Sequence, residues 1–351
     1  MFYLASTETA GPASLAFPAM LAGLKAASEE TRLRVLVLLA HGELSVTDLT
    51  DILGQSQPRI SRHLRLMTEA GLLDRRREGS WVFFRLARGG SAGPLARALA
   101  GGVDRGDPVL TDDRARLAAV RAAHARNAEA FFARHAADWD RIRSLHAPEA
   151  AVEAAVLEAV GPQPLRALLD LGTGTGRMLA LLGPRAERAV GVDVSPAMLA
   201  IARAKMREAD LSHVELRHGD ILAPPVERDA FDLVLVHQVL HVLDDPARAV
   251  REAARALRPG GRLLVVDFAP HAIESLRDSA AHRRLGFPHE AMAGFFEDAG
   301  LDMGLHRDLR PPREGEHQLT VSIWLGRDRR VRTDAPMRGV DLDVTRDQEV
   351  A

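Results

Sequence analysis

The apolar positions of the first hundred residues follow mainly a helical period. Apolar residues from Phe17 to Leu24 recur at intervals of three and four, which predicts an amphipathic helix. Ser45 and Ser56 are suited to cap later helices, and Gly54 separates the two that they begin. Three more helices are therefore expected, over about 31–39, 46–53 and 57–67.

The pattern changes after the last of these helices. Leu72 to Arg77 and Trp81 to Leu86 have the composition of strands, and the Glu-Gly-Ser sequence at 78–80 is suited to a tight turn. This predicts a β-hairpin whose first arm carries three consecutive arginines. The hairpin follows two helices joined by a glycine-containing turn, which is the helix-turn-helix arrangement.

A second pattern begins beyond residue 110. Thr111 to Arg143 contains neither proline nor glycine and predicts one long helix or two. From Val152, helical stretches alternate with short apolar runs, which predicts an α/β fold with a mostly parallel sheet and helices on both faces. Two later runs, 302–309 and 317–325, predict an antiparallel edge. The parallel strands are expected at 166–171, 188–193, 213–217, 231–236 and 261–267.

The composition limits the chemistry available to the chain. A length of 351 residues favours two domains, and 46% hydrophobic residues are enough for two cores. Cysteine is absent, which excludes disulfides, thiolate metal sites and cysteine nucleophiles. No apolar run has the length of a membrane span and no signal-peptide pattern begins the chain, so we expect a cytoplasmic protein without membrane contact.

The net charge of −2 is unevenly distributed. Residues 55–90 hold eight arginines against three acidic residues, which indicates contact with a polyanion. Arginine and glutamine make the bidentate contacts that distinguish guanine from adenine. The residues expected to contact double-stranded DNA are Gln57, Arg59, Ser61, Arg62, His63, Arg65, Arg75, Arg76 and Arg77.

Three segments of this half resemble the ArsR/SmtB family of winged-helix repressors. They are QSQPRISRHL at 55–64, EAGLL at 69–73 and RREGSWVFFRL at 76–86. The resemblance spans roughly residues 17–100 and implies a homodimer, paired through its outer helices, on a palindromic operator. The arsenic-sensing members carry a cysteine pair in the helix that corresponds to 43–49 here, so thiolate sensing at this site is excluded.

A glycine loop follows the first strand predicted in the second half. Alternate glycines in the sequence LDLGTGTG at 169–176 allow a sharp turn and a close approach of ligand to backbone. Asp193 ends the next strand, where a carboxylate can accept hydrogen bonds from two ribose hydroxyls. Asp170, just before the glycines, suits a ligand with an ammonium group better than one with a pyrophosphate. The loop therefore predicts a nucleoside site.

Together with this loop, three later regions resemble the class I S-adenosylmethionine-dependent methyltransferases. They are GVDVSPAML at 191–199, GDI at 219–221 with FDLVLV at 231–236, and LRPGGRLLVV at 257–266. The resemblance covers roughly residues 125–327 and implies S-adenosylmethionine as cofactor and S-adenosylhomocysteine as product. It does not specify the methyl acceptor.

The same resemblance implies roles for individual residues. Asp170 and the glycines would hold the methionine part, Asp193 the ribose, and Asp220 with Ile221 the adenine, while Met198 would pack on the nucleoside. The expected cofactor-binding residues are Asp170, Gly172, Thr173, Gly174, Gly176, Asp193, Val194, Met198, Asp220, Ile221 and His237.

Aromatic residues near the end of the long helix have two interpretations. Phe131, Phe132, Trp139 and Ile142 concentrate there; in the methyltransferases such a segment covers the cofactor pocket, and ordinary helix packing explains it equally well.

The expected domains are a winged helix-turn-helix at 15–88, a dimerisation helix and linker at 89–110, a helical cap at 111–160, the methyltransferase domain at 161–327 and a disordered tail at 328–351.

The chemistry of transfer is harder to assign. Displacement from a sulfonium has a good leaving group, so alignment and desolvation can suffice. His237 and His241 follow the fourth strand and are the candidate catalytic residues, each either a general base or a packing residue. No third ligand accompanies this pair, so no metal site is expected.

Two functions of different classes fit the sequence. In the first, a DNA-binding regulator carries a methyltransferase that acts on a small molecule. In the second, the same domain is a non-catalytic sensor that binds S-adenosylmethionine or S-adenosylhomocysteine to control transcription. A third reading, in which the winged helix only dimerises the enzyme, is disfavoured by the arginines.

Overall fold

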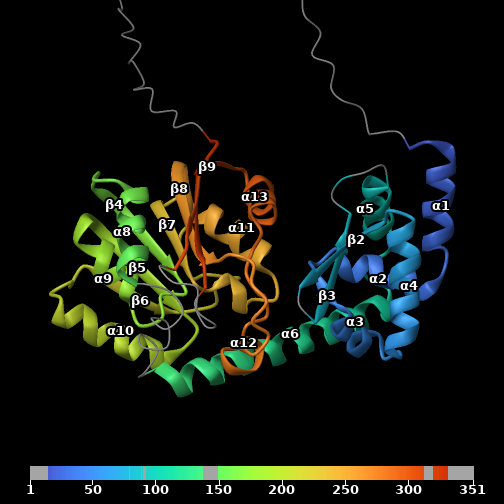
Figure 1. Cartoon of the computed structure of the whole chain (residues 1–351), viewed down its shortest axis with the longest axis horizontal. Helices are drawn as coiled ribbons and strands as arrows, with labels where there is room; N and C mark the ends of the chain where they lie inside the picture. The colour runs from blue at the N-terminus through green and yellow to red at the C-terminus, as the bar shows by residue number, and fades with distance from the viewer. Residues whose placement is uncertain are drawn as a thin grey trace, which may run out of the picture.

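The computed structural model shows two domains joined by one long helix (Figure 1). The structure describes residues 15–78, 80–87, 89, 92–136, 149–311 and 319–330. Trp139 and Ile142, which were expected in the cap, lie outside these residues.

The N-terminal domain has the expected helix-turn-helix and hairpin. Ser45 begins α3 with a capping box, in which its hydroxyl accepts from the Asp48 amide (3.1 Å) and its own amide donates to the Asp48 carboxylate (2.9 Å). Gly54 ends this helix at φ +62°, a conformation that favours glycine. The elements are α1 (Phe17–Ala27), α2 (Glu30–Leu39), β1 (Leu44–Ser45), α3 (Val46–Leu53), α4 (Gln57–Glu69), β2 (Leu73–Glu78), β3 (Trp81–Leu86) and α5 (Gly93–Gly101), with an antiparallel sheet of order β1-β3-β2.

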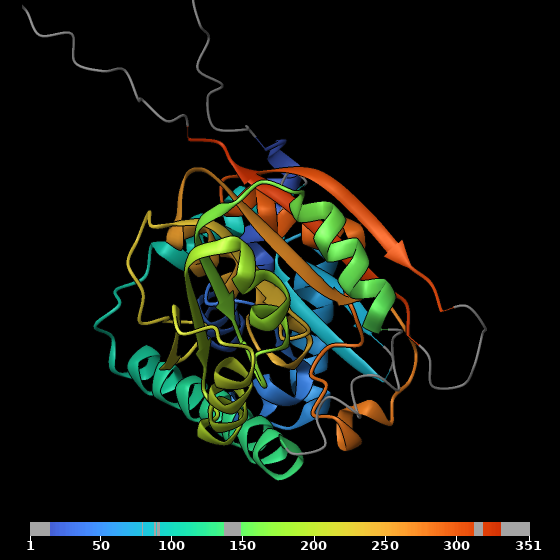
Figure 2. The same cartoon turned by 90° about the vertical axis from the view of Figure 1, so that its left-hand side faces the viewer.

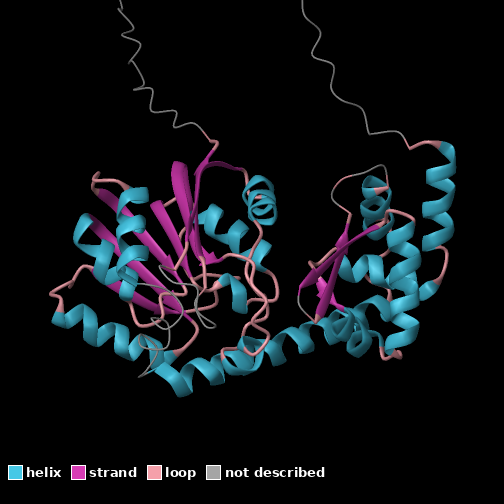
Figure 3. Cartoon of the chain, in the orientation of Figure 1, coloured by secondary structure: helices cyan, strands magenta, loops and turns pink. Residues whose placement is uncertain are grey.

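The C-terminal domain is a seven-stranded sheet with helices on both faces (Figure 3). The first five strands are parallel in the order β6-β5-β4-β7-β8, and β10 and β9 extend the sheet antiparallel. This confirms the predicted α/β architecture and its antiparallel edge. The strands are β4 (Leu165–Leu171), β5 (Ala186–Asp193), β6 (Val214–His218), β7 (Phe231–His237), β8 (Leu257–Phe268), β9 (Leu301–Leu309) and β10 (Val321–Asp328).

Alternate residues of the strands enter two different cores. Leu168 and Leu233 pack with α8 and α9, whereas their neighbours Leu169 and Val234 pack with α11 and α13 on the other face. Both faces are therefore dry, as parallel strands require. The helices are α8 (Glu149–Val160), α9 (Arg177–Leu182), α10 (Pro196–Glu208), α11 (Pro246–Ala256), α12 (Leu276–Ser279) and α13 (His289–Asp298), with short 3₁₀ turns at Gly183–Arg185 and Leu240–Val242.

Helix α6 (Pro108–His135) belongs to both domains. It runs along the lower side of the molecule in both views (Figures 1 and 2). Its first half packs on α2 and α3 and buries Leu117 in the core of the N-terminal domain, whereas Phe131 enters a core of the sheet domain. Arg34 fixes the first half through a bidentate pair with the buried Asp113 (2.7 Å for both contacts). The first part of the expected cap (111–160) is thus a helix that both domains share, and its last part is the separate helix α8.

The disordered tail was predicted to begin at residue 328, which is too early in the chain. Asp328 is still part of β10, and Arg330 pairs with Asp328 and with Asp229. These pairs raise the pKa of the Arg330 guanidinium. Residues 328–330 are therefore held against the sheet domain, and the rest of the predicted tail lies outside the described residues.

The tip of the hairpin is docked on the sheet domain. The Ser80 amide and hydroxyl both donate to Glu274 (2.7 and 3.0 Å), and Arg277 donates to the Glu78 carbonyl (3.0 Å). The guanidinium groups of Arg277 and Arg283 lie over the Trp81 ring, 4.4 and 4.7 Å from its centre. The wing therefore serves as an interdomain contact.

A buried ion cluster lies behind this contact. Arg284 is 1% exposed, donates to Glu43 (2.9 Å) and stacks 4.0 Å from the centre of the Phe83 ring. Arg76 also donates to Glu43 (3.2 Å). Burial alone would raise the pKa of Glu43, but Arg284, Arg76 and Arg85 together lower it. Glu43 is thus the common anion between the two domains.

We expect Glu43→Gln to destabilise the protein by about 3 kcal/mol at neutral pH, because the amide leaves the buried Arg284 guanidinium without its anion and removes one of the two carboxylates that pair with Arg76. The pKa of Glu43 is lowered on folding, so its contribution exists above the ordinary glutamate pKa and is lost as the pH falls through the lowered value. Urea unfolding should therefore show the two proteins converging on acidification. Glu69→Gln, which breaks an exposed pair with Arg65, should cost less than about 1 kcal/mol. Equal stability of Glu43→Gln and the parent at neutral pH would contradict the assignment.

Candidate functional site

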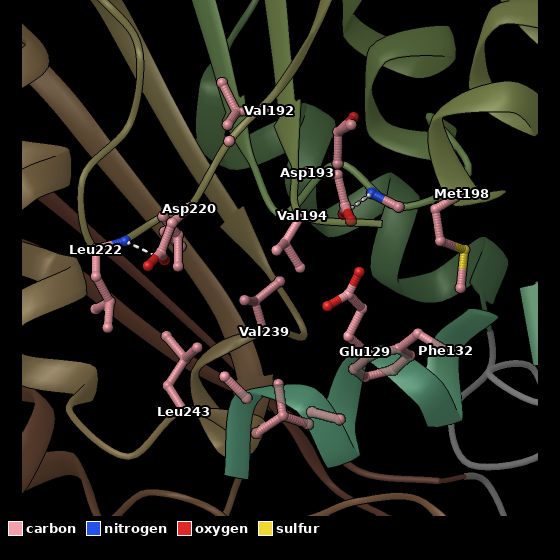
Figure 4. Close-up of a pocket in the computed structure, with 18 of the residues that line it drawn as sticks. Glu129, Phe132, Val192, Asp193, Val194, Met198, Asp220, Leu222, Val239 and Leu243 are labelled. Carbon is pink, nitrogen blue, oxygen red and sulfur yellow. Dashed lines mark hydrogen bonds between the residues drawn. The ribbon is translucent and has the colours of Figure 1, made fainter. Parts of the chain in front are cut away.

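A pocket opens where the parallel strands end, against the second half of α6 (Figure 4). The loop after β4 and the ends of β5 and β7 supply its floor, and α6 covers it. This is the position at which α/β sheets bind ligands. Expected cofactor residues in its lining are Gly172, Thr173, Gly174, Asp193, Val194, Met198, Asp220, Ile221 and His237.

The glycine loop is shaped by contacts that exclude a side chain. Gly172 has φ +73°, and a Cβ there would overlap Val239. The amides of Gly172 and Thr173 both donate to the Val192 carbonyl (2.8 and 3.0 Å), which ties the loop to the end of β5. The loop therefore brings bare backbone to the pocket wall.

Asp193 is positioned by the backbone on both sides. One carboxylate oxygen accepts from the Gly174 amide and the other from the Ser195 amide, each at 2.8 Å. Burial raises the pKa of Asp193, and these amides oppose the rise without cancelling it. Each oxygen keeps a further lone pair for a ligand hydroxyl.

Asp170 and Gly176 differ from the expectation of direct cofactor contact. Asp170 is 1% exposed, accepts from the Thr173 hydroxyl (2.6 Å) and is not part of the pocket lining. Gly176 has φ +77° and caps α9, also behind the lining. Both positions shape the loop from behind instead of lining the pocket.

Much of the remaining lining of the pocket is apolar. It includes the buried Ile221 and Met198, and Val194, which is 44% exposed. Asp220 turns its carboxylate back to accept from the Leu222 amide (2.8 Å), which fixes the loop after β6. A flat aromatic ligand such as adenine fits between such walls.

The two candidate catalytic histidines lie in different surroundings. His237 lines the pocket at the end of β7. His241 does not: it is 2% exposed, its Nδ1 lies 2.8 Å from Asp267 Oδ1, and its ring packs against His282 and Phe268. The prediction of a catalytic His241 is wrong, because its 3₁₀ turn directs the ring into the interior.

A helical cap over the pocket was predicted, but the individual side chains of α6 that line it were not, apart from Phe132. Six of its polar, small and aromatic side chains face the ligand space, and Glu129 is one of them. The spacing of three and four along a helix was the available signal. This spacing did not single out one face of the helix, because the opposite side is also rich in alanine. The lining residues of α6 are Arg121, His124, Ala125, Ala128, Glu129 and Phe132.

Gln238 also lies at this site, although it was not among the predicted site residues. It lines the pocket with φ +52°, a left-handed conformation that is uncommon for glutamine. Its amide donates to the Val266 carbonyl (2.7 Å), which holds the turn after β7. Strain of this kind is often found at functional sites.

Helix α4 presents polar side chains to solvent in the N-terminal domain. Gln57, Arg59, Ser61, Arg62 and Arg65 are exposed, as expected for a helix that enters a groove. His63 is not among them, and its predicted contact with DNA is wrong. The side chain is buried with Nδ1 3.7 Å from Glu29, and burial lowers its pKa despite that carboxylate.

The basic arm is divided between two surroundings. Arg75 and Arg77 are exposed on β2, but the intervening Arg76 turns inward to Glu43 and Glu78. The strand alternation places every second side chain on the opposite face. Arg76 therefore belongs to the domain interface, and its predicted DNA contact is wrong.

Within the described part of the chain, no three histidine or acidic side chains converge as they would around a metal ion. Its helices also include none long and apolar enough to cross a membrane.

Two family models match the chain in separate regions. One, described as bacterial regulatory protein, arsR family, matches residues 29–75; the other, described as methyltransferase domain, matches residues 169–265. The chain joins an arsR-family regulatory domain to a methyltransferase domain. The two matches confirm the resemblance of each half of the chain to its family.

Individual relatives match one domain or the other. The regulatory domain is 53% identical over 64 residues to the arsenical resistance operon repressor of Escherichia coli, covering 18% of this chain and 55% of the repressor. The methyltransferase domain is 43% identical over 107 residues to a demethylmenaquinone methyltransferase of Thermus thermophilus, covering 29% and 47%. The chain thus spans about half the length of the curated relatives that it matches.

Among solved structures, the N-methyltransferase NodS of Bradyrhizobium japonicum in complex with S-adenosylhomocysteine is similar. It is 20% identical, with a TM-score of 0.48 over 58% of this chain and 99% of NodS.

We expect the affinity of the arsR-family methyltransferase fusion for S-adenosylmethionine to fall on acidification, above the pH range of an exposed aspartate. The raised pKa of Asp193 means that this carboxylate is protonated at a higher pH and then loses an acceptor for ribose. Calorimetric titration across pH would measure this fall, and Asp193→Asn should bind weakly with no such pH step. An unchanged pH profile in Asp193→Asn would contradict the ribose-binding role.

Proposed function

We propose that this protein is a DNA-binding transcriptional regulator whose methyltransferase domain transfers a methyl group from S-adenosylmethionine to a small molecule. The observation that carries the proposal is the pocket that joins the glycine loop, Asp193 and the covering helix α6. A covered pocket admits a small acceptor and excludes water from the transfer.

The residues present fit this cofactor. Asp193 would hold the ribose hydroxyls, Ile221 and Met198 would enclose the adenine, and the backbone of the glycine loop would meet the methionine part. When bound there, the cofactor would supply an activated methyl group for transfer to the acceptor. His237 lies at the strand end where an acceptor would approach and could take the proton that the acceptor loses.

The regulatory domain would bind operator DNA as a homodimer. Exposed Arg59 and Arg62 on α4 support major-groove contact. Exposed apolar side chains on α1 support pairing with a second copy, because Phe17 is 78% exposed and Leu21 and Leu24 are 40% and 43% exposed on the same helix. A cytoplasmic location follows from contact with DNA.

To test this function, anisotropy titrations of the promoter upstream of its own gene would be made at several salt concentrations, alongside calorimetry with S-adenosylmethionine. We expect DNA affinity to fall with salt, and Arg62→Ala to reduce the logarithmic salt slope by about 1. His63→Ala is the matched control, because its buried side chain should affect stability and leave the slope unchanged. Absence of salt-dependent DNA binding would refute the regulator, and absence of cofactor binding would refute the methyltransferase.

A second candidate function, ligand-dependent control of DNA binding, is favoured by His124. This residue lines the pocket from α6, and its Nδ1 lies 2.9 Å from Oδ2 of Asp244, another lining residue. Its Nε2 lies 3.8 Å from Asp48, the capping-box residue of α3. His124 thus stands between the pocket and the helix-turn-helix.

A second cation strengthens the same connection. Arg283 donates to Asp244 (2.8 Å) and lies 3.5 Å from Asp48. Burial alone would raise the pKa of Asp244, but the hydrogen bond with His124 and the charge of Arg283 lower it. A ligand that displaces Asp244 or α6 would therefore change the electrostatic support of α3.

We expect cofactor to change the DNA affinity of the parent protein by about fivefold or more, and His124→Ala to bring this ratio close to one. Anisotropy titration with and without S-adenosylmethionine measures the ratio directly, whatever the separate affinities are. Asn127→Ala, an exposed position on the same helix, should keep the parent ratio. A ratio in His124→Ala equal to that of the parent would exclude this connection.

A further inference from the structure

Glu129 is a carboxylate on the covering helix that points into the pocket. Figure 4 shows its side chain rising from α6 toward Asp193 and Val194, beside the Phe132 ring. It lies on the helix face that also carries Ala125 and Ala128, whose small side chains leave room around it. The position faces the ribose-binding carboxylate across the ligand space.

No hydrogen bond or ion pair engages Glu129 among the described residues. The other charged groups of the lining differ in this respect, because Asp244 pairs with His124 and Arg283, and Arg121 donates to the His41 carbonyl (2.8 Å). Five carboxylates and one guanidinium line the pocket: Asp193, Asp220, Glu129, Asp244, Asp245 and Arg121. The potential inside the pocket is therefore negative, which favours a cationic ligand.

S-adenosylmethionine is such a ligand. Its sulfonium and ammonium groups outweigh its carboxylate, whereas S-adenosylhomocysteine has lost the sulfonium charge. The ribose links the adenine to the sulfur, so a ribose held at Asp193 presents the charged part of the cofactor to the neighbouring wall. Glu129 belongs to the wall that faces Asp193.

We infer that Glu129 binds the positively charged part of S-adenosylmethionine and makes the pocket select this cofactor over neutral nucleosides. The inference rests on the proposed function, because it requires the nucleoside to occupy this pocket. A protonated amine on the methyl acceptor has the same chemistry and is the other possible source of the cation. The two sources are separable, because the cofactor can be titrated without an acceptor.

The test is calorimetric titration of the full chain and of Glu129→Gln with three probes. S-adenosylmethionine carries the sulfonium and the ammonium, S-adenosylhomocysteine carries only the ammonium, and methylthioadenosine carries neither. We expect Glu129→Gln to weaken S-adenosylmethionine about tenfold, the value of one hydrogen bond to a charged group, and to leave methylthioadenosine unchanged. The change for S-adenosylhomocysteine assigns the contact: an equal loss identifies the ammonium, and a smaller loss identifies the sulfonium.

Controls separate this inference from the function on which it rests. Asp112→Asn removes an exposed charge from the same helix and should leave all three affinities unchanged, while Glu129→Asp should retain part of the selectivity. If the three probes bind Glu129→Gln as they bind the parent, the inference is overturned and the proposed function stands. If the parent protein binds none of them, the proposed function itself fails. Matching thermal unfolding of parent and variant would confirm that the fold is intact.

Discussion

The stiffness of α6 is the constraint on which the arrangement of this protein depends. One helix of 28 residues places Leu117 in one core and Phe131 in another, about 21 Å further along its axis. Because an α-helix does not bend freely over such a distance, the two domains cannot be oriented independently. The pocket, the ion cluster at Glu43 and the docked wing are all consequences of how this helix fixes the sheet domain beside the helix-turn-helix.

The interface is unusual in how much charge it encloses. Arg284 is buried, Glu43 and Arg76 are half-buried beside it, and Arg277 and Arg283 lie over an aromatic ring. Buried ion pairs contribute little net stability over an apolar contact, but they tolerate few alternative arrangements, because every charge needs its partner. Such an interface can define one relative orientation of two domains without a large hydrophobic patch.

The sequence predicted the features that depend on local pattern. Strand β5 was expected at 188–193 and occupies Ala186–Asp193, and the loop at Gly172 lies where the apolar run stopped. The errors concern residues whose role is set by distant segments. Arg76 looked like a neighbour of Arg75 and Arg77, and only the position of Glu43 and Arg284 shows why it turns inward. His241 likewise depends on Asp267 and His282, and Glu129 lies in a helix whose alanine-rich sides gave no clear face.

The shared helix also limits how this gene fusion can change over time. Each residue of an α-helix turns the chain by about 100°. Inserting or deleting one residue between Leu117 and His124 would rotate the pocket-facing side chains away from the pocket while the other half stayed packed on α3. Substitutions at exposed positions of this segment keep the rotational position of the pocket-facing side chains, whereas insertions and deletions change it. The two domains resemble separate families, yet the number of residues between them in α6 cannot change without rotating one domain's contacts relative to the other's.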